Sequence, residues 1–334
     1  MTSKKTLAGS LLSLSTGLLL AVSAIGGATA SSATTQDPSG LQVASTAIPS
    51  STAASYWTPE RMRAAVPGDV LAEQAVARYE SKGRNSSPEI TGNRSSKKIS
   101  GTSGQRTTAA LHKDERPVSH IGKVFFTLAG VNYVCSGNSV VADNSSTVAT
   151  AGHCVNQGPG AFATNFVFVP GYNNGLAPYG KWPAKTLYAP SEWSSEGNLE
   201  FDTGFAVVAS VGGEALADVV GASGVLFNEE RGLSYKSFGY PVAAPFTGQT
   251  LVSCSGKASD DAINPQFNSQ GISCDMTGGS SGGPWFIPGD GDTTELGYQN
   301  SVNSYGYGIR SVKMFGPYWG SVIENTYDTA SSAN

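Results

Sequence analysis

The chain has 334 residues, of which 14% are charged, and a formal net charge of −4 at pH 7. After residue 113 it has no basic run and no alternation of aromatic and basic residues, so nothing supports a nucleic-acid partner. It also has no nucleotide-binding motif and no Cys-x-x-Cys pair, and we therefore expect neither a cofactor nor a metal ion.

The first thirty residues predict a secretory signal peptide. Lys4 and Lys5 form a basic start, residues 7–27 are apolar or small, and Ala28-Thr29-Ala30 has the pattern of a cleavage site. An N-terminal membrane anchor is the alternative, but several serines interrupt the apolar stretch. We expect residues 1–30 to be removed and the rest to be secreted, extracellular and without a membrane partner.

Residues 31–113 predict a pro-segment that is largely disordered, with a short helical element. Ser, Thr and Ala dominate residues 31–55, a composition typical of disorder. Thr58 before Pro59 is typical of a helix start, and Asp69 is placed to cap a second short helix that reaches Tyr79. Residues 81–108 are polar again, and a plain disordered linker is the alternative. On the first interpretation this segment is a partner of the rest of the chain.

Residues 114–334 predict an all-β domain that is long enough to bury a substantial core. Apolar runs separated by turn residues are typical of strands, and they lie at 123–128, 131–135, 139–141, 166–169, 205–209, 235–238, 250–254 and 283–287. Val322, Ile323 and Tyr327 instead follow helical spacing, which predicts a short C-terminal helix over 320–329.

His153 is the candidate general base. It lies in Thr150-Ala151-Gly152-His153-Cys154, directly after an apolar run typical of a strand end. The other two histidines, His112 and His120, lie in a polar stretch before the first strong strand pattern. We therefore expect His153 to be the one histidine inside the folded domain, although a lone histidine is more often structural than catalytic.

Asp202 is the candidate partner of this histidine. It enters a nearly continuous apolar stretch at 199–208, and a carboxylate at the mouth of a buried strand must be paired or hydrogen-bonded. An imidazole N–H is a suitable donor. Asp143 and Asp218 are weaker candidates, and Asp143 is followed by residues typical of a turn.

Ser281 is the candidate nucleophile, because glycines surround it in the run Thr277–Pro284. Glycines let a scissile carbonyl approach the backbone and let N–H groups point at a developing oxyanion. A glycine-rich surface turn is the alternative for this run taken alone.

The order of the three candidates along the chain separates the known triads. Residues 279–283 match the G-x-S-x-G elbow of α/β-hydrolases, but those enzymes need a histidine after the serine and none follows Ser281. The subtilisin order needs an aspartate at a strand end before the histidine, and neither Asp114 nor Asp143 has that setting. The order His153, Asp202, Ser281 is that of chymotrypsin.

With these two blocks in this order, residues 118–325 resemble the chymotrypsin-fold serine peptidases. The blocks around His153 and Ser281 look like those of secreted bacterial members, close to the V8-like or glutamyl-endopeptidase-like group. The resemblance implies two six-stranded antiparallel β-barrels with the active site in the cleft between them, and we place their boundary near 210–222. It also implies that the backbone N–H groups of Gly279 and Ser281 form the oxyanion hole.

Four cysteines in a secreted chain indicate two disulfides, for which three pairings exist. The resemblance implies a Cys135–Cys154 bridge, because family members place one beside the histidine, and this leaves Cys254 with Cys274.

Two departures from the family pattern concern activation and specificity. Ser280 stands where trypsin-like zymogens carry the aspartate that receives the new N-terminus, so we expect the pro-segment to act by blocking or templating. Residues 307–311 lack the histidine of glutamate-specific relatives. Arg310 is a candidate replacement that would favour acidic P1 residues, and Asp275 is a candidate that would favour basic ones. Both specificities stay open, and a solvated surface arginine is the alternative for Arg310.

The sequence thus predicts a secreted, monomeric serine endopeptidase that acts on proteins or peptides through an acyl-enzyme intermediate. A catalytically silent relative that serves as a binding module is the alternative, although such proteins usually lose a triad member. An esterase is disfavoured by the chain order.

Overall fold

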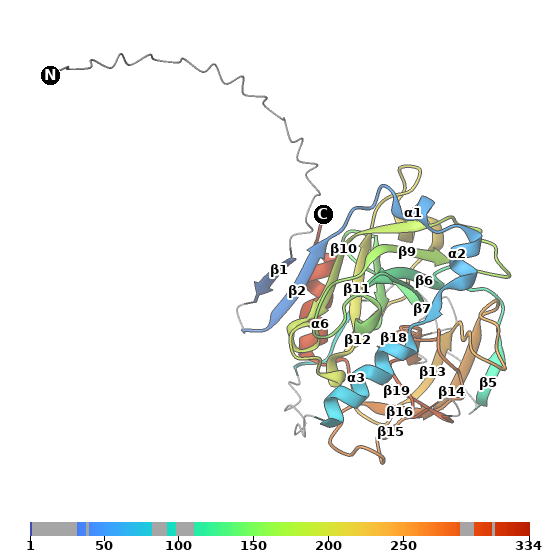
Figure 1. The fold of residues 1–334 in the computed structure, drawn as a ribbon. Coiled ribbons are helices and arrows are strands. Elements are labelled where there is room, and N and C mark those ends of the chain that lie inside the picture. The colour runs from blue at the N-terminus through green and yellow to red at the C-terminus, as the bar shows by residue number, and fades with distance from the viewer. Residues whose placement is uncertain (2–31, 38–39, 82–91, 98–109, 288–296, 309–310) are drawn as a thin grey trace.

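The computed structural model of the protein describes residues 1, 32–37, 40–81, 92–97, 110–287, 297–308 and 311–334. The predicted signal peptide therefore lies outside the described residues, apart from Met1. In the described ranges the fold is mostly β, with short helices at its periphery (Figure 1). No helix among these residues is long and apolar enough to cross a membrane.

The first half of the domain is a closed six-stranded antiparallel barrel, as expected. Antiparallel pairings run in the order β6, β7, β8, β11, β10 and β9, and β9 pairs with β6 to close the ring. The strands are β6 (Ile121–Leu128), β7 (Val131–Val140), β8 (Thr147–Thr150), β9 (Thr164–Pro170), β10 (Trp182–Pro190) and β11 (Gly204–Val208). A two-residue turn joins β6 to β7, and both its residues, Ala129 and Gly130, have positive φ, which suits the twist of a tight hairpin.

The second half contains two sheets that together form a second ring of strands. Neighbouring strands pair within each sheet, and the two sheets are joined by packing and by a few hydrogen bonds. Direct pairing gives the order β12, β18, β17, β13, β14, and a smaller sheet contains β15, β16 and β19. β14 packs on β16, while Phe315 of β19 exchanges hydrogen bonds with Tyr305 just after β18. The strands are β12 (Val225–Phe227), β13 (Ser234–Gly239), β14 (Val252–Lys257), β15 (Ser259–Asp260), β16 (Gln270–Ser273), β17 (Pro284–Ile287), β18 (Tyr298–Val302) and β19 (Lys313–Gly316).

Short helices lie between and after these strands. They are the 3-10 turns η1 (Gly152–Cys154) and η2 (Leu199–Phe201), and the helices α4 (Ser191–Ser194), α5 (Leu216–Val220) and α6 (Ser321–Ser331). The helix α6 confirms the predicted C-terminal helix. It packs on the first barrel, where Tyr327 meets the ring of Phe205 edge-on at 5.8 Å between centroids.

The described residues before 114 contain more strands and helices than the sequence predicts. It contains β1 (Ser32–Gln36), β2 (Gln42–Ala47), α1 (Ala53–Tyr56), α2 (Pro59–Ala64), β3 (Val66–Pro67), α3 (Asp69–Ser81), β4 (Ser95–Lys97) and β5 (Ala110–Asp114). Thr58 caps α2 as expected, since its Oγ1 accepts from the N–H of Arg61 at 3.3 Å.

Tertiary contacts explain why these N-terminal residues form strands and helices. β2 pairs with β10, β4 with β12 and β5 with β14, so strands of the two barrels supply the hydrogen-bond partners. Trp57 is fully buried against Phe125 and donates from Nε1 to the carbonyl of Asn165 at 2.6 Å. A polar local composition predicts disorder only where no folded surface offers such partners.

Candidate active site

His153 is fixed at the end of the first barrel by a covalent and a steric constraint. It lies in η1, directly after β8, and its neighbour Cys154 is bonded to Cys135 of β7. A Cβ on Gly152 would lie 2.8 Å from Oδ1 of Asp202, so a glycine is needed for the close approach of η1 to that carboxylate. The imidazole is fully buried.

The structure brings Asp202 against this histidine. Its Oδ1 accepts from the backbone N–H of His153 at 2.7 Å, and Oδ2 lies 2.8 Å from Nδ1 of the same residue. Ser304 also donates from Oγ to Oδ2 at 2.5 Å. These partners explain how a fully buried carboxylate is tolerated. Because a carboxylate accepts only, Nδ1 carries the proton and Nε2 is left to accept one.

Ser281 is held through its backbone. Its carbonyl accepts from the N–H of Ser136 in β7 at 2.7 Å, and the N–H of Gly282 donates to Asn303 O at 2.7 Å. Gly282 has a φ of 78°, and a Cβ there would lie 2.1 Å from Oγ1 of Thr150. The turn therefore requires glycine and joins the second half to β7 and β8.

Asn303 supports this turn from below and was not predicted from the sequence. It is fully buried, and its Oδ1 accepts from Ser237 Oγ and Trp285 Nε1, both at 2.7 Å. Its Nδ2 donates to the carbonyl of Phe238 at 2.9 Å and to that of Ser280 at 3.0 Å. An asparagine at a strand end carries no sequence signal of this role.

The two residues before Ser281 are also fixed by hydrogen bonds. The carbonyl of Gly279 accepts from Ser136 Oγ at 2.9 Å, and Ser280 donates from Oγ to Thr277 O at 2.8 Å. Among the described residues, the N–H groups of Gly279 and Ser281 donate no hydrogen bond. Two amides in one rigid turn are therefore available to an incoming acceptor.

A cavity of about 390 Å³ opens beside Ser281. Its wall includes Asp275, Tyr305, Gly306 and Lys313, together with Asp69, Ala72 and Glu73 of the N-terminal segment. Lys313 donates from Nζ to Ser259 Oγ at 2.9 Å and is a cation of this cavity that the sequence did not single out.

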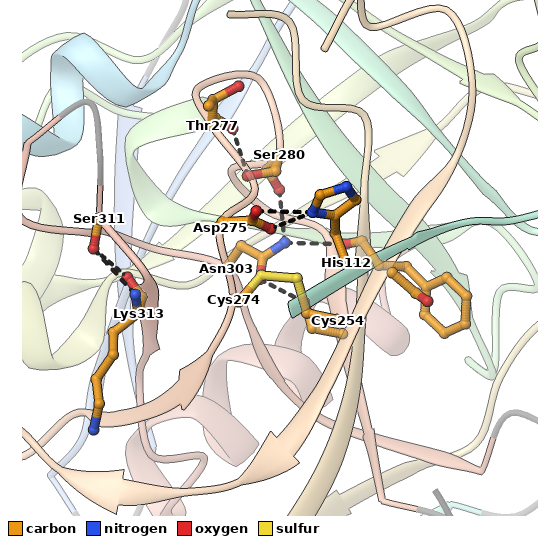
Figure 2. The surroundings of a disulfide bond; sticks show 12 residues. His112, Cys254, Cys274, Asp275, Thr277, Ser280, Asn303, Ser311 and Lys313 are labelled. Atoms are coloured by element: carbon orange, nitrogen blue, oxygen red, sulfur yellow. Dashed lines mark hydrogen bonds and ion pairs between the residues drawn. A yellow bond between two sulfur atoms is a disulfide. The ribbon is translucent and has the colours of Figure 1, made fainter. Parts of the chain in front are cut away.

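The two predicted specificity residues fare differently. Asp275 lines the cavity, and both its carboxylate oxygens lie 2.8 Å from Nδ1 of His112, next to the disulfide between Cys254 and Cys274 (Figure 2). Arg310 lies outside the described residues. Both disulfides pair as expected.

The expectation that His153 is the only histidine in the folded domain was wrong. His120 is 3% exposed and its Nδ1 lies 2.8 Å from Oδ1 of Asn138, while His112 belongs to β5. The strand pattern did not reveal this, because the stretch between the two histidines is mostly polar and charged. The weaker acid candidates lie elsewhere: the N–H of Asp143 donates to Ser331 Oγ, and Asp218 is exposed on α5.

One group in the described part has the composition of a metal site. Ligand atoms of Cys135, His153 and Cys154 lie within 4.8 Å of one another, but the two sulfurs are bonded to each other. A disulfide offers no thiolate, so we interpret this group as the bridge beside the histidine.

The solved structures similar to this chain include two with clear sequence similarity. Protease Anisep from Arthrobacter nicotinovorans is 65% identical, with a TM-score of 0.65, over 67% of this chain and all of that one. The thermostable serine protease AL20 from an extremophilic microorganism is 49% identical, with a TM-score of 0.61, over 65% of this chain and 98% of its own. A Glu endopeptidase, 19% identical with a TM-score of 0.51, shares the fold.

Comparison with curated proteins gives a shorter match. An extracellular metalloprotease of Bacillus subtilis (strain 168) is 33% identical over 72 residues, which is 22% of this chain and 22% of that protein. No protein-family model matches the chain.

Proposed function

The chain belongs to the serine proteases of the chymotrypsin fold, and on this premise we propose that it is a secreted endopeptidase whose catalytic residues are His153, Asp202 and Ser281. The observation that carries the proposal is the fully buried pair of His153 and Asp202, whose ring nitrogen and carboxylate oxygen are 2.8 Å apart. Ser304, which lines the same cavity as Ser281, donates to that carboxylate and so connects the pair to the cavity. The chain's order of histidine, aspartate and serine agrees with this assignment.

In the proposed mechanism, Ser281 Oγ attacks the scissile carbonyl while Nε2 of His153 takes its proton. The same nitrogen then donates that proton to the leaving amine, and an acyl-enzyme forms on Ser281. A water, deprotonated by Nε2, attacks this ester and releases the acid. Asp202 stays ionised throughout, because it holds Nδ1–H and stabilises the imidazolium.

The oxyanion is assigned to the backbone N–H groups of Gly279 and Ser281. Both belong to the rigid turn that Ser136 and Asn303 support, and both are without a protein acceptor among the described residues. Donors that are aimed in advance at the developing charge need no reorganisation in the transition state. Removing one such donor in a related site lowers kcat by about 10²–10³-fold.

We assign secretion to residues 1–30 and regulation to the segment up to residue 113. The curated match to an extracellular protein supports the first assignment.

The specificity for the P1 residue stays open between acidic and basic side chains. The cavity beside Ser281 is lined by a carboxyl group, on Asp275, and by an amino group, on Lys313, which would favour opposite charges. A peptide-library cleavage profile is the measurement that decides between them.

The experiment that tests the function is Ser281→Ala. We expect secretion and folding to persist, whereas peptide cleavage falls by on the order of 10⁶-fold, as when a triad serine is removed. Labelling by a serine-directed phosphonate should vanish too. Ser210→Ala, at an exposed serine, is the matched control and should keep both activities. Cleavage that survives in Ser281→Ala would contradict the assignment of the nucleophile. A wild-type chain that neither cleaves nor labels would contradict the proposal and favour a silent binding module.

A further inference from the structure

The N-terminal segment enters the cleft beside the candidate catalytic histidine. β3 pairs in parallel with β7, with Val66 opposite Tyr133 and Pro67 opposite Val134, and the N–H of Gly68 donates to Val134 O at 2.9 Å. The next residue of β7 is Cys135, which is bridged to Cys154. This pairing delivers Gly68 and Asp69 to the disulfide that flanks His153.

Gly68 lies tightly against this disulfide. A Cβ at Gly68 would lie 2.5 Å from Sγ of Cys135, 3.3 Å from Val134 O and 3.9 Å from Cδ2 of His153. The backbone of the segment therefore runs next to the imidazole, in a space that accepts glycine alone. An incoming substrate cannot occupy the same space.

Asp69 places a carboxylate inside the active-site cavity. Both its oxygens lie 2.1 Å from the position of a Cβ on Gly278, so the group rests against the glycine run that leads to Ser281. Asp69 and Ser281 line the same cavity. Burial raises the pKa of this carboxyl group, and the nearby His153 opposes the shift. Its Oδ1 has no hydrogen-bond partner among the described residues.

The helix α3, which begins at Asp69, is anchored along its length. Tyr79 meets the ring of Phe267 edge-on at 4.9 Å and donates to Oε1 of Glu200 at 3.3 Å. Arg78 donates to the carbonyl of Gly158 at 2.8 Å. The buried face of α3 consists of Leu71, Ala72, Ala75, Val76 and Tyr79. In Figure 1 this helix crosses the front of the molecule between β7 of the first barrel and the strands of the second half.

We propose that residues 66–81 are an autoinhibitory segment, which fills the substrate cleft of the unprocessed chain with Asp69 at the reaction centre. This inference rests on the proposed function and names the regulation of the same site. The segment resists cleavage because it offers Ser281 a side-chain carboxylate, which is a poor electrophile. From Asp69 onward its own peptide carbonyls lie in a helix, where intrahelical hydrogen bonds hold them. Activity requires α3 to leave the cleft.

The test compares phosphonate labelling rates of unprocessed full-length chains, with intact mass verified. Tyr79→Ala removes an anchor of α3, Gly68→Ala introduces a contact with the disulfide, and Asp69→Ala empties the cavity. Each should label about tenfold faster than wild type, the change expected when a segment docked for about nine-tenths of the time no longer blocks the cavity. Asp69→Asn keeps the space filled and should stay as slow as wild type. Gln74→Ala, at an exposed position of α3, is the matched control.

A second measurement covers variants that fail to fold. Wild-type chain should label faster in urea concentrations below its unfolding transition, because a docked helix is released by local opening before the barrels unfold. The proposal is overturned if the wild-type chain labels as fast as the three releasing variants, or if urea does not raise its rate before unfolding. If no chain labels at any urea concentration, the proposed function fails instead.

Discussion

The two sides of the candidate active site are built in different ways. On the first barrel, His153 and Asp202 are held by side-chain hydrogen bonds, by burial and by a disulfide. On the second half, backbone hydrogen bonds from Ser136 to the carbonyl of Ser281 and from Gly282 to that of Asn303 hold the turn, which needs glycine at position 282. Side-chain contacts therefore hold the histidine and the aspartate in place, whereas the backbone conformation of the turn holds the serine.

This difference teaches where each side is vulnerable. An isosteric change of Asp202 to asparagine keeps the shape of the buried side chain and alters the charge and hydrogen bonding of the site. At Gly282, any side chain collides with Thr150 and moves the nucleophile itself. The comparison therefore predicts a loss of catalysis without unfolding for a conservative change on the first side. A smaller loss is expected where the second half contacts that side, and an effect on stability alone is expected at the boundary between the halves.

The largest effect is expected for Asp202→Asn. An amide can donate to Nδ1 and thereby stabilise the wrong tautomer of His153, so we expect kcat to fall by about 10⁴-fold, as in a related triad. The far-ultraviolet circular dichroism spectrum should not change. Asp218→Asn, at an exposed aspartate, is the control and should keep full activity. A loss below tenfold would remove Asp202 from the mechanism.

A smaller effect is expected for Ser304→Ala, which cuts the one described side-chain link from the second half to Asp202. A hydrogen bond to a charged group contributes about 1.5–3 kcal/mol, which corresponds to a loss of about ten- to hundredfold in kcat. Ser304 is a positioning residue, so we expect kcat to fall with KM unchanged, and Ser304→Thr to recover part of the loss. A change confined to KM would assign Ser304 to substrate binding.

The smallest effect concerns the boundary between the halves. Lys123 of β6 is 4% exposed, lies over the ring of Tyr172 and donates from Nζ to Gly248 O at 3.0 Å. Burial lowers its pKa from 10.5 to about 8. Between these values the unfolded chain binds more protons than the folded one, so this residue makes stability rise with pH across that window.

Lys123→Met tests this effect by denaturant unfolding at pH 7 and pH 10. The wild-type free energy of unfolding, relative to that of the variant, should rise by about 2 kcal/mol between these values. The comparison with the variant removes contributions of other titrating groups, including the buried tyrosines. A relative free energy that does not change with pH would contradict the lowered pKa of Lys123, and one that falls would indicate a pKa that is raised by folding.

Several elements of the fold were predictable from local sequence. The apolar runs at 123–128, 166–169 and 205–209 correspond to β6, β9 and β11, because these strands are buried on both faces. β10 and β18 were not predicted. β10 contains Pro183, Lys185 and Pro190, and β18 has the polar core Gln299-Asn300-Ser301, so neither shows a strand pattern before its partners are known. The strands and helices within residues 32–37 and 40–81 were also not evident from local sequence, because β2, α1 and α3 depend on packing against the barrels.

By itself, the sequence determined the fold class and the three candidate catalytic residues, because glycine spacing and chain order are local or one-dimensional properties. The sequence also determined the N-cap of α2, which is Thr58, and the presence of the C-terminal helix α6. Only the tertiary structure decided that Ser304 and Asn303 support the site, that His112 meets Asp275, and that Asp69 reaches the cavity of Ser281. These contacts join residues more than twenty positions apart, and in most cases more than a hundred, and no periodicity or spacing encodes which distant side chains meet.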